Sequence, residues 1–154
     1  MGAALHCMKT VHKSVLIWFS AQEMFSLVTD IERYPQFLPW CDQASVLDQQ
    51  EHGMTARVGI SIGGIRQAFT TRNLHAPGRQ VQMQLVEGPF SRLDGQWTFS
   101  PLGNDERACK VEFTLRYDFD STTLAALVGP VFDKIAGSLV DAFVKRANQV
   151  YGQA

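Results

Sequence analysis

Residues 110–119 read KVEFTLRYDF, in which polar and apolar side chains alternate without interruption. Because successive side chains of a β-strand point to opposite faces, this pattern predicts a strand with one buried face and one solvated face. Residues 55–62, 80–86 and 92–100 alternate in the same way. Such one-sided strands are typical of antiparallel sheets, whereas strands of parallel sheets are apolar on both faces.

Three further stretches extend the predicted sheet to about seven strands. Residues 10–19 are rich in β-branched and aromatic side chains, and residues 43–50 and 65–74 alternate less cleanly. Turn-forming residues separate the strands of the middle region. These separators are residues 51–53, 63–64, 76–79, 88–89 and 103–106.

Two helical regions flank the run of strands. Ser20 and Glu23 form an S-x-x-E capping box, which predicts a helix that begins directly after the first strand. Pro35 and Pro39 interrupt this pattern and predict a short helical turn and a loop over residues 34–40. Apolar residues then recur at helical spacing from Ser121 to the end of the chain, and Pro130 should kink or divide this long helix.

These elements predict an α+β fold in which a curved antiparallel sheet of about seven strands wraps around the long C-terminal helix. The sheet has one apolar face, and this helix, about 40 Å long at 1.5 Å per residue, is the only element large enough to cover it. One helix does not fill such a sheet along its whole length, so we expect an apolar cavity between them. Small residues of the helix leave further room: Ala125, Ala126, Ala136 and Gly137.

Composition limits the classes of function. The chain has 154 residues, which suits one domain, and we expect residues 1–8 to form an extension and residues 9–151 to form the folded domain. A net charge of −1 argues against a DNA-binding protein, and no apolar run approaches the roughly 18–20 residues of a membrane span. The three cysteines, Cys7, Cys41 and Cys109, show no zinc-site spacing, so we expect reduced thiols in a cytoplasmic protein.

Several long strings resemble one known family in the same order. These are YPQFLPWC (34–41), FTTRN (69–73), QLVEGPF (84–90), LDGQWTFSPL (93–102) and VFDKIAGSLVDAFVKRANQVY (131–151). They are similar to the ribosome association toxin (RatA) and coenzyme Q-binding START-domain family, which has the helix-grip fold of START and birch-pollen-allergen-like domains. The resemblance covers about residues 9–151.

The resemblance implies two binding functions. Family members hold ubiquinone or another polyprenyl lipid in the cavity, and transient membrane contact is compatible with that role. The bacterial members associate with the large ribosomal subunit and block subunit joining. The family was also once labelled oligoketide cyclase, so a polyketide cyclase-like enzyme is a third reading.

The candidate ligand cavity is assigned to residues on the inner face of the sheet and the facing side of the helix. Burial of apolar ligand area, at roughly 25 cal/mol/Å², would drive binding there without charged contacts. The alternative is a filled core with no usable cavity. The candidate residues are Ile60, Ile62, Phe69, Met83, Leu85, Glu87, Trp97, Phe113, Leu115, Tyr117, Val128, Phe132, Ile135 and Leu139.

Glu87 is the one acid in this set, because it continues the inward alternation of Val81, Met83 and Leu85. At the mouth of the cavity it would accept a hydrogen bond from a polar head group. The alternative is a loop carboxylate that pairs with an arginine or a backbone N–H.

Two other groups of residues are candidates for contact with partners. Phe37, Trp40 and Phe90 lie in predicted loops and would form a gate, unless they pack under the edge of the sheet. On the polar face of the sheet, basic residues outnumber acidic residues six to three, which suits contact with ribosomal RNA but is also ordinary for a solvated face. The ribosome-facing candidates are Arg57, Arg66, Arg72 and Arg92.

Catalytic and metal-binding signals are weak. His12, His52 and His75 have no metal-ligand spacing, and Asp133 and Asp141 are read as part of a solvated helix face. An enzyme needs convergent polar groups with tuned pKa values, and the inner face offers almost none. The sequence therefore favours a non-enzymatic protein without a cofactor or metal. It binds ubiquinone or another lipid in the primary reading and the ribosome in the alternative.

Overall fold

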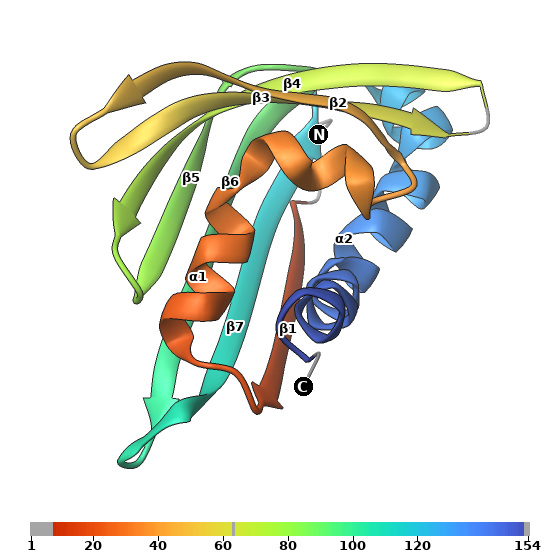
Figure 1. The fold of residues 1–154 in the computed structure, drawn as a ribbon. Coiled ribbons are helices and arrows are strands. Elements are labelled where there is room, and N and C mark those ends of the chain that lie inside the picture. Colours follow the sequence, from red (N-terminus) through yellow and green to blue (C-terminus); the bar gives the residue numbers. More distant parts are fainter. Residues whose placement is uncertain (1–7, 63, 153–154) are drawn as a thin grey trace.

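A curved antiparallel sheet and one long helix make up most of the molecule, as the sequence predicts (Figure 1). The computed structural model describes residues 8–62 and 64–152, without the side chains of Ile62, Asp105 and Glu106. The strands are β1 (Lys9–Ile17), β2 (Cys41–Gln50), β3 (Gly53–Ile62), β4 (Ile65–Ala76), β5 (Gln80–Glu87), β6 (Phe90–Leu102) and β7 (Asp105–Phe119). The helices are α1 (Ala21–Thr29), the 3₁₀ helix η2 (Ile31–Gln36) and α2 (Thr122–Tyr151).

The strand order is β1-β7-β6-β5-β4-β3-β2, and every neighbouring pair is antiparallel. Strands β2 to β7 follow one another as hairpins, and β1 pairs with β7 at one edge. Figure 1 shows β2, β3 and β4 curling over toward the side of the sheet on which the helices lie. This curvature produces a concave face, and that face is the apolar one.

Helix α1 begins as the capping box predicts. The Ser20 hydroxyl accepts from the Glu23 backbone N–H at 3.0 Å, and the Glu23 carboxylate accepts from the Ser20 backbone N–H at 2.9 Å. Both bonds satisfy backbone donors that the first turn leaves unpaired. Buried Met24 and Val28 then place α1 against the concave face of the sheet.

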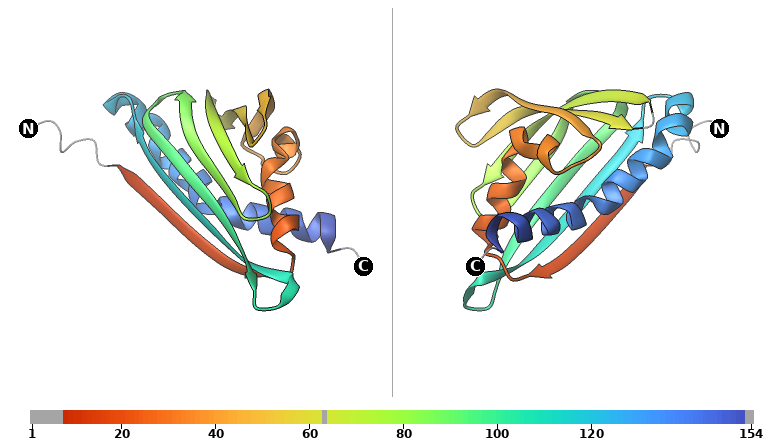
Figure 2. Two further views of the ribbon diagram at one scale, coloured as in Figure 1. Left: turned by 90° about the vertical axis from the view of Figure 1, so that its left-hand side faces the viewer. Right: turned by 45° about the vertical axis from the view of Figure 1, so that its right-hand side comes forward.

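Helix α2 runs as one continuous helix from its cap at Ser121, although Pro130 lies inside it. The expected kink therefore does not divide the helix, and Figure 2 shows α2 bending along its length as it crosses the sheet. Helix α2 is long and apolar enough to cross a membrane by length and composition alone. Core helices of water-soluble proteins meet the same criterion. Its residues Phe132, Ile135, Val140 and Phe143 are buried in the core.

Aromatic rings fill much of the space between α2 and the sheet. Trp97 of β6 lies 4.5 Å from the Phe113 ring and 5.2 Å from the Phe143 ring, measured between ring centroids. The offset and edge-on arrangements of these rings are the ones that aromatic pairs prefer. Cys41 and Cys109 are buried free thiols, and burial raises the pKa of each to about 11, so both stay protonated at neutral pH.

The expected N-terminal extension lies almost wholly outside the described residues. Of residues 1–8, the structure describes Met8 alone, and Cys7 falls in the part that is not described. Strand β1 begins at Lys9.

Candidate functional site

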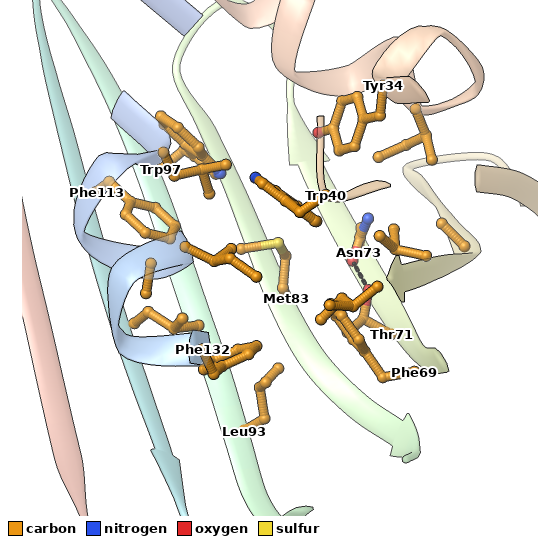
Figure 3. A pocket seen from close by; sticks show the side chains of 18 residues that line it. Tyr34, Trp40, Phe69, Thr71, Asn73, Met83, Leu93, Trp97, Phe113 and Phe132 are labelled. Atoms are coloured by element: carbon orange, nitrogen blue, oxygen red, sulfur yellow. Dashed lines mark hydrogen bonds between the residues drawn. The ribbon is translucent and has the colours of Figure 1, made fainter. Parts of the chain in front are cut away.

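A mainly apolar cavity of about 80 Å³ lies between the concave face of the sheet and helix α2 (Figure 3). It is several times larger than the roughly 10–15 Å³ that one buried water molecule needs. The interior is therefore not packed solid, and a prenylated quinone would need the lining side chains to move. The lining residues are Ile31, Tyr34, Trp40, Ala56, Val58, Ile60, Phe69, Thr71, Asn73, Met83, Leu93, Trp97, Phe113, Leu115, Phe132, Ile135, Ala136 and Leu139.

Nine of the fourteen candidate residues line this cavity. They come from strands β3 to β7 and from α2, because strand alternation and helical periodicity point their side chains to the same side. The nine residues are Ile60, Phe69, Met83, Trp97, Phe113, Leu115, Phe132, Ile135 and Leu139.

Three other candidates, Leu85, Tyr117 and Val128, lie outside the described lining. Leu85 is half-buried and packs against the core, while Tyr117 and Val128 are buried in it. The side chain of Ile62 lies outside the part of the chain that the structure describes. The Tyr117 hydroxyl donates to Asp133. The pKa of Tyr117 is raised mainly by burial and, to a smaller extent, by the Asp133 carboxylate.

The predicted inward position of Glu87 is wrong. The Glu87 side chain is exposed, and its neighbour Val86 is 57% exposed. The cause is a bulge in the β4–β5 pairing, where Thr71 faces Leu85 but Thr70 faces Glu87. An extra residue in one strand shifts the inward and outward alternation, so the pattern of Val81, Met83 and Leu85 does not continue to Glu87.

The three proposed gate residues occupy different environments. Trp40 lines the cavity and is half-buried, as a residue at its mouth would be. Phe37 packs edge-on against Phe143, with the Arg146 guanidinium 5.0 Å from its ring centroid. Phe90 is 6% exposed and begins strand β6 instead of lying in an open loop.

The placement of Phe90 in an exposed loop is therefore corrected. Its ring contacts Phe69, Tyr117, Phe119 and Phe132, which makes it part of the core. The pairing of β6 with β7 is irregular between Phe90 and Arg92, so Phe90 turns inward although the alternation of Leu93, Trp97 and Phe99 would place it on the outer face.

Two polar residues of the cavity wall, Thr71 and Asn73, were missed in the sequence. Alternation from Phe69 places both on the inner face, but polar side chains on that face obscure the pattern of β4. Both are buried, and the Thr71 hydroxyl donates to the Asn73 Oδ1 at 2.8 Å. The spacing of residues 69, 71 and 73 could have revealed them, since every second side chain of a strand points to the same face.

The described residues that line the cavity include no acid, histidine, lysine, arginine or cysteine. Tyr34 brings a hydroxyl to the wall, but this hydroxyl donates to the Val28 carbonyl oxygen, and burial raises the pKa of Tyr34. The cavity can therefore enclose an apolar molecule and contact a few of its polar atoms, whereas the described lining provides no acid–base pair for catalysis.

The four ribosome-facing candidates lie exposed on the convex face of the sheet. Arg66 pairs with Asp42 at 3.0 Å, and Arg92 pairs with Asp94 at 3.2 Å. Within the described residues, Arg57 and Arg72 form no ion pair, so their charges are available to a partner.

Asp133 also differs from its predicted role on a solvated helix face. Its carboxylate accepts from the Lys9 ammonium at 2.5 Å and from the Tyr117 hydroxyl. These contacts join α2 to the first residue of β1 and to β7. Asp133 therefore connects three elements beside the cavity.

Known proteins resemble this chain over nearly its whole length. It is 47% identical over 146 residues to a ribosome association toxin, RatA, of Vibrio cholerae, covering 95% of this chain and 100% of the relative. The identity to RatA of Pseudomonas aeruginosa is 42%, with 92% and 97% of the two chains covered. A mitochondrial coenzyme Q-binding protein of Xenopus laevis is 27% identical, with 92% of this chain and 59% of that protein covered.

Solved structures agree with the fold. A START superfamily protein of Mycobacterium smegmatis gives a TM-score of 0.76 at 22% identity, with 94% of this chain and 99% of that chain covered. An 18 kDa protein of Caulobacter crescentus gives a TM-score of 0.73 at 27% identity, again with 94% and 99% covered. The resemblance read from the sequence and the helix-grip fold are both confirmed.

The family model for "polyketide cyclase / dehydrase and lipid transport" matches residues 17–144. This match spans α1, all but the first strand of the sheet, and most of α2, so it includes the described cavity wall. The chain therefore belongs to the polyketide cyclase/dehydrase and lipid transport family, in which it groups with the RatA sequences.

Proposed function

We propose that this protein associates with the large ribosomal subunit in the cytoplasm and blocks subunit joining. The observation that carries the proposal is the full-length similarity to proteins named ribosome association toxins, at 47% and 42% identity. The coenzyme Q-binding relative is more distant, at 27% identity over 59% of its length. The comparisons thus favour the alternative reading of the sequence over its primary reading, ubiquinone binding.

The convex face of the sheet is the surface that we assign to ribosome contact. Arg72, Gln84, Asp94 and Arg116 face one another in register across β4, β5, β6 and β7. Both Arg92 and Arg116 pair with Asp94, so this part of the row carries more positive than negative charge. Exposed arginine and amide side chains suit RNA, because they contact phosphates and base edges.

Cosedimentation with purified large subunits tests this assignment. In the double variant Arg57→Glu/Arg72→Glu we expect at least a tenfold loss of binding at low salt, because two unpaired cations become anions. The control Lys134→Glu/Lys145→Glu makes the same change in net charge on exposed residues of α2. We expect it to bind as the unmodified protein does.

Loss of binding in both double variants would indicate a dependence on net charge and would contradict the surface assignment. The unmodified protein should also inhibit subunit joining in a reconstituted assay. Failure to cosediment at low salt would refute ribosome association itself.

A second function is supported by the cavity. We propose that the protein also holds ubiquinone or another apolar molecule between the sheet and α2, without catalysing a reaction. Binding in this cavity is favourable for an apolar ligand, because the ligand's apolar surface is removed from water. The wall there includes Trp97, Phe113, Phe132 and Leu139. The coenzyme Q-binding relative supports the same class of ligand.

Native mass spectrometry of the purified chain, followed by solvent extraction, tests this second function. The variant Ala136→Leu adds apolar atoms at a buried residue of the cavity wall, so we expect loss of the extracted lipid. The control Ala126→Leu makes the same change at an exposed position of α2 and should retain the lipid. Equal retention of lipid by both variants would contradict binding in this cavity.

A further inference from the structure

An open hollow of about 510 Å³ lies on the convex face of the sheet, over strands β5, β6 and β7. Helices α1 and α2 lie on the opposite, concave side, so neither of them covers it (Figure 1). Its volume falls within the roughly 300–1,000 Å³ of sites that bind small molecules. The described lining is mainly polar and includes three glutamines, two arginines and one aspartate.

The two arginines of this hollow share one carboxylate. Nε of Arg92 donates to Oδ2 of Asp94 at 3.2 Å, and Nε of Arg116 lies 3.8 Å from Oδ1 of the same side chain. The terminal amino groups of both guanidinium groups form no bond with a residue that the structure describes. Guanidinium groups bind phosphate oxygens through such N–H groups. One carboxylate therefore positions two phosphate-binding groups beside the hollow.

The charge around the hollow has a small positive excess. Arg72 of β4 adds a third cation beside Arg92 and Arg116, because it lies in register with the glutamines of β5. Asp118 faces Arg92 across the β6–β7 pairing, so these three arginines stand against two aspartates, Asp94 and Asp118. Such a balance suits contact with one or two phosphates, whereas tight binding along a duplex backbone depends on many more cations.

The glutamines of the hollow have free donors and free acceptors. Gln82 and Gln96 lie opposite each other, and their Nε2 groups donate to Gln80 at 3.5 Å and to Thr98 at 3.2 Å. Each Nε2 keeps a second hydrogen, and neither amide oxygen accepts a bond from the described part of the chain. An amide that offers a donor beside an acceptor matches the edge of a base, such as N7 and N6 of adenine.

These groups favour RNA whose bases are unpaired. The major groove of an A-form duplex is too deep and narrow for side chains to read, whereas loops and single strands expose the edges of their bases. A phosphate on the arginines and a base on the glutamines are two parts of one nucleotide. A protein partner is less favoured, because protein interfaces centre on aromatic and apolar side chains, and the described lining includes no aromatic residue.

We propose that the convex hollow binds a nucleotide of unpaired RNA, with its phosphate on Arg92 and Arg116 and its base on Gln82 and Gln96. The inference rests on the proposed ribosome association and deepens it, because it names the kind of RNA that the convex face contacts. The arginines supply affinity that depends on salt, and the glutamines supply affinity that depends on the base.

Fluorescence anisotropy of the full chain with three labelled probes tests the proposal. The first probe is an adenine-rich RNA strand of about twenty nucleotides, which is longer than a typical single-strand binding site. The second is that strand in a duplex with its complement, and the third is an abasic strand of equal length. The single strand should bind at least about tenfold more tightly than the duplex or the abasic strand, as one bidentate base contact predicts.

The two roles are separated by variants. Arg92→Gln/Arg116→Gln should weaken binding of the single strand and of the abasic strand about tenfold at low salt. It should also reduce the slope of log affinity against log salt by about 1.4, since two phosphate contacts are lost. The control Lys134→Gln/Lys145→Gln makes the same change in net charge on exposed residues of α2 and should change neither quantity.

The glutamine variant should behave differently. Gln82→Met/Gln96→Met should bind the single strand as weakly as the abasic strand, with an unchanged salt slope, because it removes base contacts alone. The control Gln43→Met/Gln149→Met makes the same change at exposed residues outside the hollow and should keep the preference for the single strand.

The unmodified protein gives the outcomes that overturn the proposal. Equal affinity for the single strand and the abasic strand, or for the single strand and the duplex, would refute a site for an unpaired nucleotide. Cosedimentation with large subunits without binding of any RNA probe would also refute it, would indicate contact with ribosomal protein, and would leave ribosome association intact. Binding of the single strand without cosedimentation would instead refute ribosome association and support the nucleotide site.

Discussion

His75 is a residue whose burial links stability to pH. Its Nε2 atom is buried and has no hydrogen-bond partner among the described residues, and its ring packs edge-on against Phe25 of α1 at 5.7 Å between centroids. Burial lowers the pKa of His75 from its ordinary value of 6.5. The folded protein therefore binds this proton less readily than the unfolded chain does, so stability falls as the pH drops below about 6.5.

We expect the melting temperature to fall between about pH 7.5 and pH 5.5, and to fall less in the variant His75→Phe, which cannot be protonated. His12→Gln is the matched control, because His12 is exposed on β1. Thermal unfolding of the three proteins at the two pH values measures the effect. An equal loss of melting temperature in His75→Phe and in the unmodified protein would show that other groups cause it.

For individual residues, the sequence predicts the face of the sheet on which a side chain lies better than it predicts the contacts of that side chain. The alternation in residues 110–119 correctly places Phe113 and Leu115 in the cavity wall. It fails at Glu87, because nothing in the sequence reveals the extra residue that breaks the β4–β5 register. It also gave no reason to select Asn73, since the burial of a polar side chain becomes visible only when neighbouring side chains have positions.

At the scale of the secondary-structure elements, one carboxylate links β1, β7 and α2. Asp133 accepts from Lys9 and Tyr117, and Tyr117 is 1% exposed. Loss of the carboxylate would leave a buried hydroxyl unpaired, which costs about 1–3 kcal/mol of folding free energy. The sequence did not distinguish Asp133 from Asp141, because both carboxylates lie among lysines on the same helix.

Asp133→Ala should therefore lower the free energy of unfolding by about 1–3 kcal/mol. Asp141→Ala, at an exposed position of the same helix, should change it by no more than about 0.5 kcal/mol. Urea unfolding followed by circular dichroism measures both. The added substitution Tyr117→Phe should recover part of the loss in Asp133→Ala, and equal losses in the two single variants would contradict the role of Asp133.

The elements themselves were largely predictable, for reasons that differ between strands and helices. The capping box at Ser20 and the cap at Ser121 fix where α1 and α2 begin, because each satisfies local backbone donors. Pro130 was harder to interpret, since a helix can remain continuous past a proline that removes one hydrogen bond. The size of the cavity was not predictable, because it depends on the packing of many side chains at once.

On the scale of the whole molecule, the two proposed binding surfaces lie on opposite faces of one sheet. The cavity uses the concave face, and the row that includes Arg72 uses the convex face. We therefore expect Arg57→Glu/Arg72→Glu to keep its affinity for the ubiquinone analogue decylubiquinone within about twofold. Ala136→Leu should likewise cosediment with large subunits as the unmodified protein does.

Measuring ribosome binding and decylubiquinone binding in both variants tests whether the two surfaces act independently. A loss of ribosome binding in Ala136→Leu, with an unchanged melting temperature, would contradict this independence. Such a result would indicate instead that the ligand site and the ribosome-binding face are energetically coupled through the sheet.

The residues Thr71, Arg72 and Asn73 of β4 point alternately to the cavity, to the convex face and to the cavity again. Both proposed activities thus depend on three consecutive positions of one strand. A single inserted or deleted residue within β4 would exchange the two sets of side chains, so that a guanidinium would enter the cavity and an amide would face solvent. Over evolutionary time, this segment can change by substitution while its length stays constrained.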